Sequence, residues 1–281
     1  MYESLEDELG DIVAKARRGQ ELEVEALCRK TGIAEEDWQR LERYEWTPDA
    51  PVISHIAEAL ELDGQKLLTS ALRNFFPQKP SGAAPQDVHV EMLVLGSSFL
   101  MNGYVVGCRR TGRALCVDPG FDGAKVLAAA AQASLSIEQI VLTHGHHDHI
   151  GALAEVQEET QARVYISAED RPMLGDLEAR VDATISEGDR VVVGALTFAV
   201  CATGGHTPGC ISLVGHGIAL VGDALFAGSL GGTRSRVHYD NQRRAVAQHL
   251  LALEEETALY PGHGPATTVG EERLNNPFFR S

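Results

Sequence analysis

Residues 141–153 read VLTHGHHDHIGAL, and positions 144–149 within them hold four histidines and one aspartate. The whole chain of 281 residues has 11 histidines, so this loop is strongly enriched. The apolar run QIVL (139–142) leads into it, and an apolar stretch with helical spacing begins near Ile150. A loop at the end of a strand lets side chains converge without disturbing the core. The stretch therefore predicts a strand-end site with metal-binding side chains.

The spacing inside the loop separates the side chains into two pairs. His144 and His146 alternate with Gly145, so in extended backbone both face the same side. Asp148 and His149 follow further round the turn and would face a neighbouring point. Two pairs that face two nearby points indicate two metal ions.

Three later positions also place a metal-capable side chain at the end of a predicted strand. They are His206 in TGGHTPG, Asp223 in LVGDALF and His263 in YPGHGP. Each lies next to glycine, which lets the backbone approach a crowded site. Imidazole and carboxylate are the usual ligands of zinc and iron. The expected centre holds two divalent ions and leaves room for a solvent ligand.

These motifs, with VDPG upstream, resemble the metallo-β-lactamase superfamily over residues 90–279. The tail PGHGPATTVGEERLNNPF resembles the short bacterial branch of glyoxalase II, the hydroxyacylglutathione hydrolases. The resemblance implies an αββα sandwich with the metals at one edge. It also implies a first metal on His144, His146 and His206, and a second on Asp148, His149 and His263. Asp223 would bridge them, and His147 fills a variable position that is not expected to bind metal.

The expected activity follows from such a centre. Metal binding lowers the pKa of water to about 7, so a bridging hydroxide would be available to attack an acyl carbonyl at neutral pH. Asp148 would orient it, and a thiolate leaving group needs little protonation. We therefore expect a glyoxalase II-like thioester hydrolase. Asp118 in VDPG would either fix a turn or hydrogen-bond a metal-bound histidine.

The sequence identifies candidate substrate-binding residues by weaker motifs than the metal ligands. Larger glyoxalase II enzymes hold glutathione with a C-terminal helical domain, whereas here residues 224–281 are all that follow Asp223. The Gly-rich segment 227–240 offers four candidate contacts for an anionic substrate, which are Arg234, Arg236, His238 and Tyr239. Arginines in such a loop either bind anions or remain solvated, and both readings stay open.

The pattern of apolar residues changes along the chain. Residues 1–76 show the three-and-four spacing of successive amphipathic helices, and 77–86 (PQKPSGAAPQ) has the composition of a linker. Residues 87–281, which the resemblance makes the hydrolase domain, alternate short β-rich runs with helical stretches, and this pattern predicts an αβ sandwich or layered sheet. The predicted fold class is mixed α/β (α+β), with a small all-α domain before the αββα sandwich. Because every predicted ligand follows the linker, the chain is expected to fold as a hydrolase with its metals after removal of residues 1–80.

Residues 8–72 resemble the helix-turn-helix domain of the phage-repressor class. The helix that would enter the DNA groove, however, begins Ala34-Glu35-Glu36-Asp37. In this fold those positions face bases and phosphates, which repel carboxylates. The sequence therefore favours a homodimer contact or a protein partner over nucleic acid.

The composition bears on the binding partners and the cellular location of the protein. The net charge of −16 does not suit a nucleic-acid binder, and five cysteines without a CxxC pair favour reduced thiols and a cytoplasmic location. The first residues lack the pattern of a signal peptide, and apolar runs are too short to span a membrane. Two alternatives stay open. One is a mononuclear-iron persulfide dioxygenase on the same scaffold, and the other is a DNA-binding regulator whose second half senses a metabolite.

Overall fold

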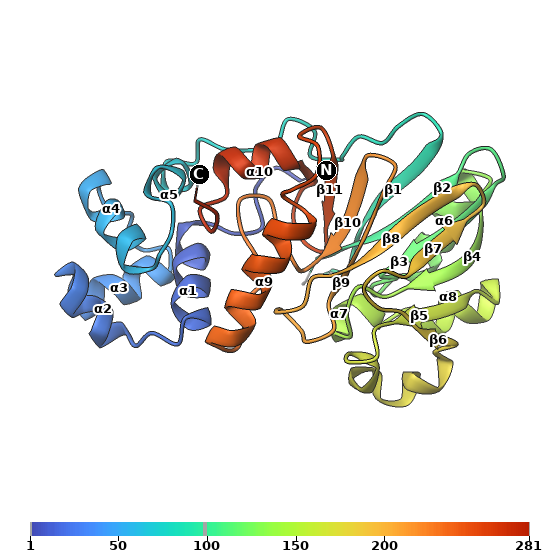
Figure 1. Ribbon diagram of the computed structural model, residues 1–281, viewed down its shortest axis with the longest axis horizontal. Coiled ribbons are helices and arrows are strands. Elements are labelled where there is room, and N and C mark those ends of the chain that lie inside the picture. The colour runs from blue at the N-terminus through green and yellow to red at the C-terminus, as the bar shows by residue number, and fades with distance from the viewer. Residues whose placement is uncertain (1, 98–99, 281) are drawn as a thin grey trace.

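The protein is a sandwich of two six-stranded sheets with helices on both outer faces and a helical bundle at one end (Figure 1). It is seen here as a computed structural model that describes residues 2–97 and 100–280. Residues 1 and 281, the outer ends of the two predicted domains, lie outside the described residues. Within the described part, none of the helices has the length and apolar character that a membrane crossing needs.

The first sheet has the strand order β1-β2-β3-β4-β5-β6. Its strands are β1 (Val88–Leu95), β2 (Met101–Cys108), β3 (Arg113–Val117), β4 (Ser136–Val141), β5 (Arg163–Ile166) and β6 (Ala183–Thr184). The pairs β1–β2 and β2–β3 are antiparallel, and the pairs from β3 to β6 are parallel. Helices α6 (Gly123–Gln132) and α8 (Leu153–Thr160) cover its outer face, where Val126 and Leu153 pack on the sheet residue Ile140.

The second sheet has the strand order β12-β11-β10-β9-β8-β7. Its strands are β7 (Arg190–Val193), β8 (Leu196–Ala202), β9 (Ile211–Gly215), β10 (Ile218–Gly222), β11 (Ala258–Pro261) and β12 (Thr267–Thr268). The pair β10–β11 is parallel, and the others are antiparallel. Its outer face carries α9 (Arg236–His249) and α10 (Val269–Asn275). Two short elements complete the sandwich, α7 (His147–Ile150) and the 3₁₀ helix η1 (Arg171–Arg180).

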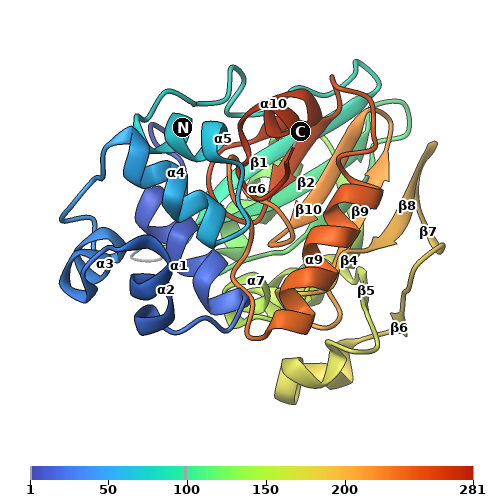
Figure 2. The same ribbon diagram turned by 60° about the vertical axis from the view of Figure 1, so that its left-hand side comes forward.

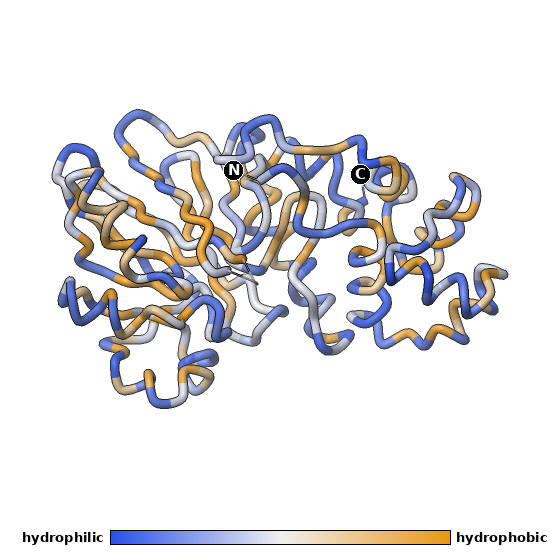
Figure 3. The backbone as a smooth tube through the Cα atoms, turned by 180° about the vertical axis from the view of Figure 1, so that it is seen from behind, coloured by the Kyte–Doolittle hydropathy of each residue, from blue (hydrophilic) through white to orange (hydrophobic). Residues whose placement is uncertain are grey.

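The main core lies between the two sheets. Alternate residues of facing strands fill it, with Leu115 and Val117 from β3 against Phe198 and Leu213 from the second sheet. Such alternation is what a strand with one face in the core requires. Hydrophobic residues follow the strands, and hydrophilic ones gather in the outer loops (Figure 3). Two packed sheets with helices outside confirm the predicted αββα fold class.

The first part of the chain forms five helices, as its apolar spacing predicts. They are α1 (Leu9–Gly19), α2 (Val24–Thr31), α3 (Glu35–Glu42), α4 (Ala50–Ala59) and α5 (Gly64–Ala71). Asp49 and Asp63 cap the starts of α4 and α5 by accepting backbone N–H bonds. Gly32 ends α2 with a φ of 73°, a left-handed conformation that glycine adopts without strain. The resemblance of this bundle to a helix-turn-helix domain stays a prediction.

The helical bundle does not have a separate core. One buried apolar cluster joins Leu27 and Trp38 of the bundle to Leu225, Tyr239 and Phe278 of the sandwich. Helix α1 contacts α9, and α5 contacts α10 (Figures 1 and 2). The predicted linker 77–86 has no helix or strand but is anchored too, since Gln78 N donates to Glu271 (2.8 Å). The predicted domain boundaries, and the folding of the chain without residues 1–80, stay predictions, and the shared cluster implies a cost in stability when those residues are removed.

A variant that lacks residues 1–80 should be much less stable than the full chain. Removal of residues 1–80 would expose Leu225, Tyr239 and Phe278, which are at most 2% exposed in the full chain. Burial of each such side chain contributes roughly 1.5–3 kcal/mol, so the free energy of unfolding should fall by several kcal/mol. Thermal unfolding of the two proteins measures this directly. An unchanged Tm in the truncated protein would contradict the shared core.

Candidate metal centre

The predicted ligands meet at one edge of the sandwich. Four of them follow β4 and run into α7, one lies between β8 and β9, one follows β10 and one follows β11. Because β10 and β11 are parallel neighbours, their carboxyl ends reach the same edge and bring Asp223 and His263 together. All seven predicted ligand residues are brought together there, namely His144, His146, Asp148, His149, His206, Asp223 and His263.

The first cluster consists of His144, His146 and His206. One ring nitrogen of each lies within 4.8 Å of the others. His206 Nε2 is 2.9 Å from His146 Nδ1. The other ring nitrogen of His206, Nδ1, is 2.7 Å from the carbonyl oxygen of Gly232. Nδ1 can donate to that carbonyl, which leaves the lone pair of Nε2 directed at the cluster. This is the tautomer that binds a metal through Nε2.

The second cluster consists of Asp148, His149 and His263. Asp148 Oδ2 is 3.2 Å from His263 Nε2 and 3.6 Å from His149 Nε2. His263 Nδ1 is 2.8 Å from the carbonyl oxygen of Leu100, so its other nitrogen faces the centre. The cluster thus offers one carboxylate and two imidazole nitrogens to a common point.

Asp223 lies between the two clusters. Its Oδ2 is 3.3 Å from His206 Nε2, and its Oδ1 is 3.4 Å from His149 Nε2. A Cβ atom at Gly262 would lie 2.1 Å from Asp223 Oδ1, so glycine is what leaves room for this carboxylate. One carboxylate therefore reaches both sets of imidazoles.

The donor atoms fit divalent cations. His144 Nε2, His149 Nε2 and Asp223 Oδ1 are buried and have no hydrogen-bond partner within residues 2–97 and 100–280. Buried polar atoms are normally paired, and each unpaired one costs about 1–3 kcal/mol. Three such atoms in one place, of the types that bind zinc or iron, indicate that ligation by metal satisfies them.

The charges of the site also favour cations. Burial and the neighbouring imidazoles hold the pKa of His144 well below its usual value, so its ring is neutral. Burial raises the pKa of Asp223, but His149 and His263 outweigh burial and hold it well below the usual range. Asp118 and Asp223 raise the pKa of His149 against the opposite effect of burial. The same negative charges that favour a proton on His149 would favour a metal at that nitrogen.

Asp118 makes the hydrogen bonds that both of its predicted roles require. Its Oδ1 accepts a bond from the backbone N–H of Thr143 (2.8 Å), which fixes the turn. Its Oδ2 is 2.8 Å from Nδ1 of His149, so it accepts that proton and directs His149 Nε2 at the centre. A carboxylate behind a metal-binding histidine commonly orients the ring in this way.

Asp170 supports the site, and the sequence motifs do not include it. Its buried carboxylate accepts bonds from Gly145 N (3.1 Å), Gly209 N (2.8 Å) and Thr207 Oγ1 (2.5 Å). Gly145 belongs to the first ligand loop, whereas Thr207 and Gly209 belong to the loop that carries His206. Asp170 therefore holds two ligand loops together, which no local sequence signal announces.

Two amides support the other ligand loops in the same way. Asn102 Nδ2 donates to the carbonyls of Pro261 (3.0 Å) and Gly264 (2.8 Å), on either side of His263. Gln242 Nε2, from α9, is 3.3 Å from the carbonyl of Asp223 and 3.1 Å from that of Gly231. Both amides are fully buried, so they fix the backbone around the last two ligands.

The four residues predicted to contact substrate differ from one another in their burial and in their partners within the protein. Arg236 lies 3.3 Å from Glu61 and 2.9 Å from Asp240, so carboxylates of the protein already occupy its guanidinium. Tyr239 is buried in the cluster shared with the N-terminal helices. Arg234 is exposed and His238 half-buried, and substrate contact by these two stays a prediction. His147 is exposed and lies in neither cluster of donors.

The N-terminal segment borders the metal centre, which the sequence did not suggest. The Tyr2 hydroxyl donates to Asn102 Oδ1 (2.9 Å). A Cβ atom at Gly264 would lie 2.9 Å from Glu6 Cβ, so glycine next to His263 allows this close approach. Glu6 is exposed overall. Partial desolvation raises the pKa of its carboxyl, His263 lowers it, and Asp223 raises it. Glu6 is therefore close enough to act electrostatically on two of the predicted ligands.

Comparison with known proteins agrees with this geometry. Residues 100–263 match the metallo-beta-lactamase superfamily. The chain is 29% identical to hydroxyacylglutathione hydrolase GloC of Haemophilus influenzae over 186 residues, which are 60% of this chain and 88% of that protein. It is 34% identical to a hydroxyacylglutathione hydrolase of Aeromonas hydrophila over 167 residues, which are 58% of this chain and 61% of that protein.

Solved structures give the same result. The B3 metallo-beta-lactamase BLEG-1 superposes with a TM-score of 0.62 and 28% identity, over 69% of this chain and 100% of that one. ETHE1 from Myxococcus xanthus superposes with a TM-score of 0.58 and 28% identity, over 67% of this chain and 83% of that one. The protein TTHA1623, in a di-iron-bound form, superposes with a TM-score of 0.57 and 31% identity, over 68% of this chain and 100% of that one. The matched family and the fold together show that this chain belongs to the metallo-beta-lactamase superfamily, as a metal-dependent hydrolase.

Proposed function

We propose that the protein hydrolyses thioesters with a dinuclear metal centre. The observation that carries this proposal is the position of Asp223, whose two oxygens lie 3.3–3.4 Å from nitrogens of both imidazole clusters. A carboxylate in that position suits two metal ions that share a ligand. The relatives named hydroxyacylglutathione hydrolase support a thioester as the bond that is cleaved.

In this proposal the first ion is held by His144, His146 and His206, and the second by Asp148, His149 and His263. Asp223 would serve both. When bound, the ions would supply a water whose pKa is lowered to about 7 and would polarise the acyl carbonyl. The donor set suits zinc and iron alike, so the proposal does not depend on which of them is bound.

The side chains around the centre hold protons and charges in place. Asp148 is 18% exposed, against 6% for Asp223, so it is the carboxylate that can orient an attacking water. Asp118 keeps a proton on Nδ1 of His149, which leaves Nε2 as a ligand. A thiol has a pKa of about 8.5, so the leaving thiolate requires little help from a general acid.

A persulfide dioxygenase with a single iron is the alternative on this scaffold. Both activities can use this set of seven donors, and the relatives named hydroxyacylglutathione hydrolase are what favours the hydrolase. Oxygen consumption with glutathione persulfide distinguishes the two. Rapid oxygen uptake by protein that cleaves no thioester would support the dioxygenase.

We further propose that the helical bundle contacts protein and not DNA. Glu35 and Glu36 are exposed at the start of α3, where a DNA-reading helix needs contact with bases and phosphates. Arg40 is bound to Asp37 (2.9 Å), so it does not offset this negative charge. The regulator hypothesis therefore lacks the positive surface that nucleic acid requires.

The reaction itself is tested with a panel of thioesters. Purified, metal-loaded protein should release free thiol from S-lactoylglutathione or from other acyl thioesters, and a thiol reagent detects that release. The panel should vary the acyl group and the thiol carrier separately. Folded, metal-loaded protein that releases thiol from none of them would overturn the proposal.

Metal content tests the shared ligand. The wild-type protein should carry about two divalent ions per chain, since seven donors of suitable type converge. Asp223→Ala should bind fewer ions and lose more than roughly 100-fold in kcat/KM, because both sites lose a ligand. His147→Ala is the matched control, since this histidine lies in the same loop outside both clusters. Elemental analysis that finds two ions and full turnover in Asp223→Ala would contradict the bridging role.

Glu6 should influence which thioesters are accepted. Its carboxylate acts on His263 and Asp223, so it should repel a substrate with a negative group near the centre. Glu6→Gln should raise kcat/KM for an anionic thioester relative to a neutral one, by roughly twofold to tenfold at low salt. Glu3→Gln removes an exposed charge from the same segment and serves as the control. An equal change for both substrates would show that Glu6 does not discriminate by charge.

A further inference from the structure

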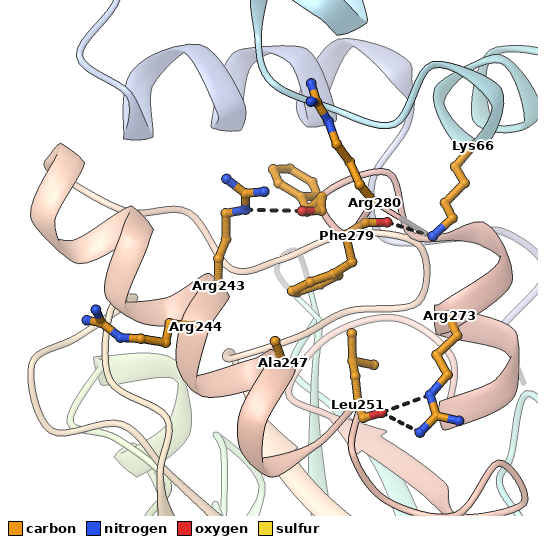
Figure 4. Close-up of a pocket in the computed structure, with 9 residues that line it drawn as sticks. Lys66, Arg243, Arg244, Ala247, Leu251, Arg273, Phe279 and Arg280 are labelled. Atoms are coloured by element: carbon orange, nitrogen blue, oxygen red, sulfur yellow. Dashed lines mark hydrogen bonds between the residues drawn. The ribbon is translucent and has the colours of Figure 1, made fainter.

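A pocket separate from the metal centre gathers positive charge. It has a volume of about 580 Å³ and lies between α5, α9, α10 and the C-terminal segment (Figure 4). Five cationic side chains line this cationic pocket, namely Lys66, Arg243, Arg244, Arg273 and Arg280. Its apolar lining includes Phe278, Phe279 and Leu251, and the lining includes none of the seven predicted metal ligands. The pocket is therefore a distinct feature of the molecule.

Three of the cations are held in place by the backbone that forms the pocket. Lys66 Nζ donates to the carbonyl of Phe279 (2.6 Å), and Arg243 Nε donates to that of Phe278 (3.1 Å). Arg273 Nε donates to the carbonyl of Leu251 (2.8 Å). These bonds fix the C-terminal segment against α5 and α9, so the pocket is preformed.

The charges in the pocket are only partly balanced. Arg273 has Glu255 at 3.5 Å, and Asp63 and Glu272 act on Lys66. Within residues 2–97 and 100–280, by contrast, no carboxylate forms an ion pair with Arg243, Arg244 or Arg280. Among the residues that the structure describes, no acidic side chain lines the pocket, although the chain carries a net charge of −16. A bound anion would balance the charges that have no carboxylate partner.

We propose that the cationic pocket binds a small organic phosphate. A guanidinium presents paired N–H donors that match phosphate oxygens, and Arg243 and Arg280 approach the pocket from α9 and from the C-terminal segment (Figure 4). The phenyl ring of Phe279 and the side chain of Leu251 offer apolar surface to the organic part of the ligand. The volume is in the range of about 300–1,000 Å³ that is typical of small-molecule sites. A ligand there would bridge Lys66 of α5 in the bundle and Arg243 of α9 in the sandwich.

Binding of phenyl phosphate to the full-length, metal-loaded protein tests the proposal. Calorimetry should show one site per chain, and the Tm should rise with phenyl phosphate concentration. Inorganic phosphate should bind more weakly, since it lacks the ring. Arg280→Glu should weaken binding of phenyl phosphate by roughly tenfold or more, because it reverses one of the unpaired charges. Arg110→Glu, at an exposed arginine outside the pocket, should leave binding unchanged.

Arg280 suits this test because the described residues show no hydrogen bond or ion pair from its side chain, so its replacement should leave the fold intact. The Tm of the variant without ligand checks that point, and Arg243→Lys provides a second variant that keeps the charge but loses the guanidinium. Binding that is unaffected by either substitution would place the phosphate elsewhere, for example at the metal centre, and would overturn the proposal. So would equal affinity for inorganic phosphate, or an Arg280→Glu effect on oligomer mass without an effect on ligand binding.

Discussion

The buried carboxylate of Asp223 is the constraint on which the site depends. It carries negative charge in the interior, where an ion is stable only with opposite charge or full hydrogen bonding. The imidazoles of both clusters surround it at 3.3–3.6 Å, yet its Oδ1 lacks a hydrogen-bond partner within the described residues. Gly262 leaves the space that this carboxylate fills, Gly231 leaves space for the backbone carbonyl of Asp223, and Gln242 donates to that carbonyl. The surrounding structure thus holds a charge that divalent cations would balance.

The scaffold positions this site through buried polar anchors. Asp118 orients His149, Asp170 joins the loop of His144 to that of His206, and Asn102 holds the backbone on both sides of His263. Each anchor satisfies its own hydrogen bonds while it fixes a loop, so the donors need not be ordered by the metal itself. Such preorganisation favours binding because less conformational entropy is lost when the ion arrives.

The helical bundle and the sandwich act as one structural unit. They share an apolar cluster, and Lys15 of α1 donates to the carbonyl of Leu230 (2.9 Å) while its ammonium lies 4.6 Å from the Phe226 ring centroid. The Phe226 ring in turn packs against His263, with centroids 5.6 Å apart. The first residues of the chain therefore border the metal centre at one end of the contact, and the cationic pocket lies at the other.

The sequence alone predicted the αββα class, which the fold confirms, and the seven candidate metal ligands, which the structure brings together. It could do so because four of the seven lie within six residues, and the others stand in motifs that resemble a known family. The tertiary structure decided what surrounds them. Asp170 is 37 residues from Thr207, and Asn102 is 162 from Gly264, so neither bond leaves a local pattern. The same holds for Arg236, which pairs with Glu61 of the bundle, because contacts between distant segments exist only once the chain has packed.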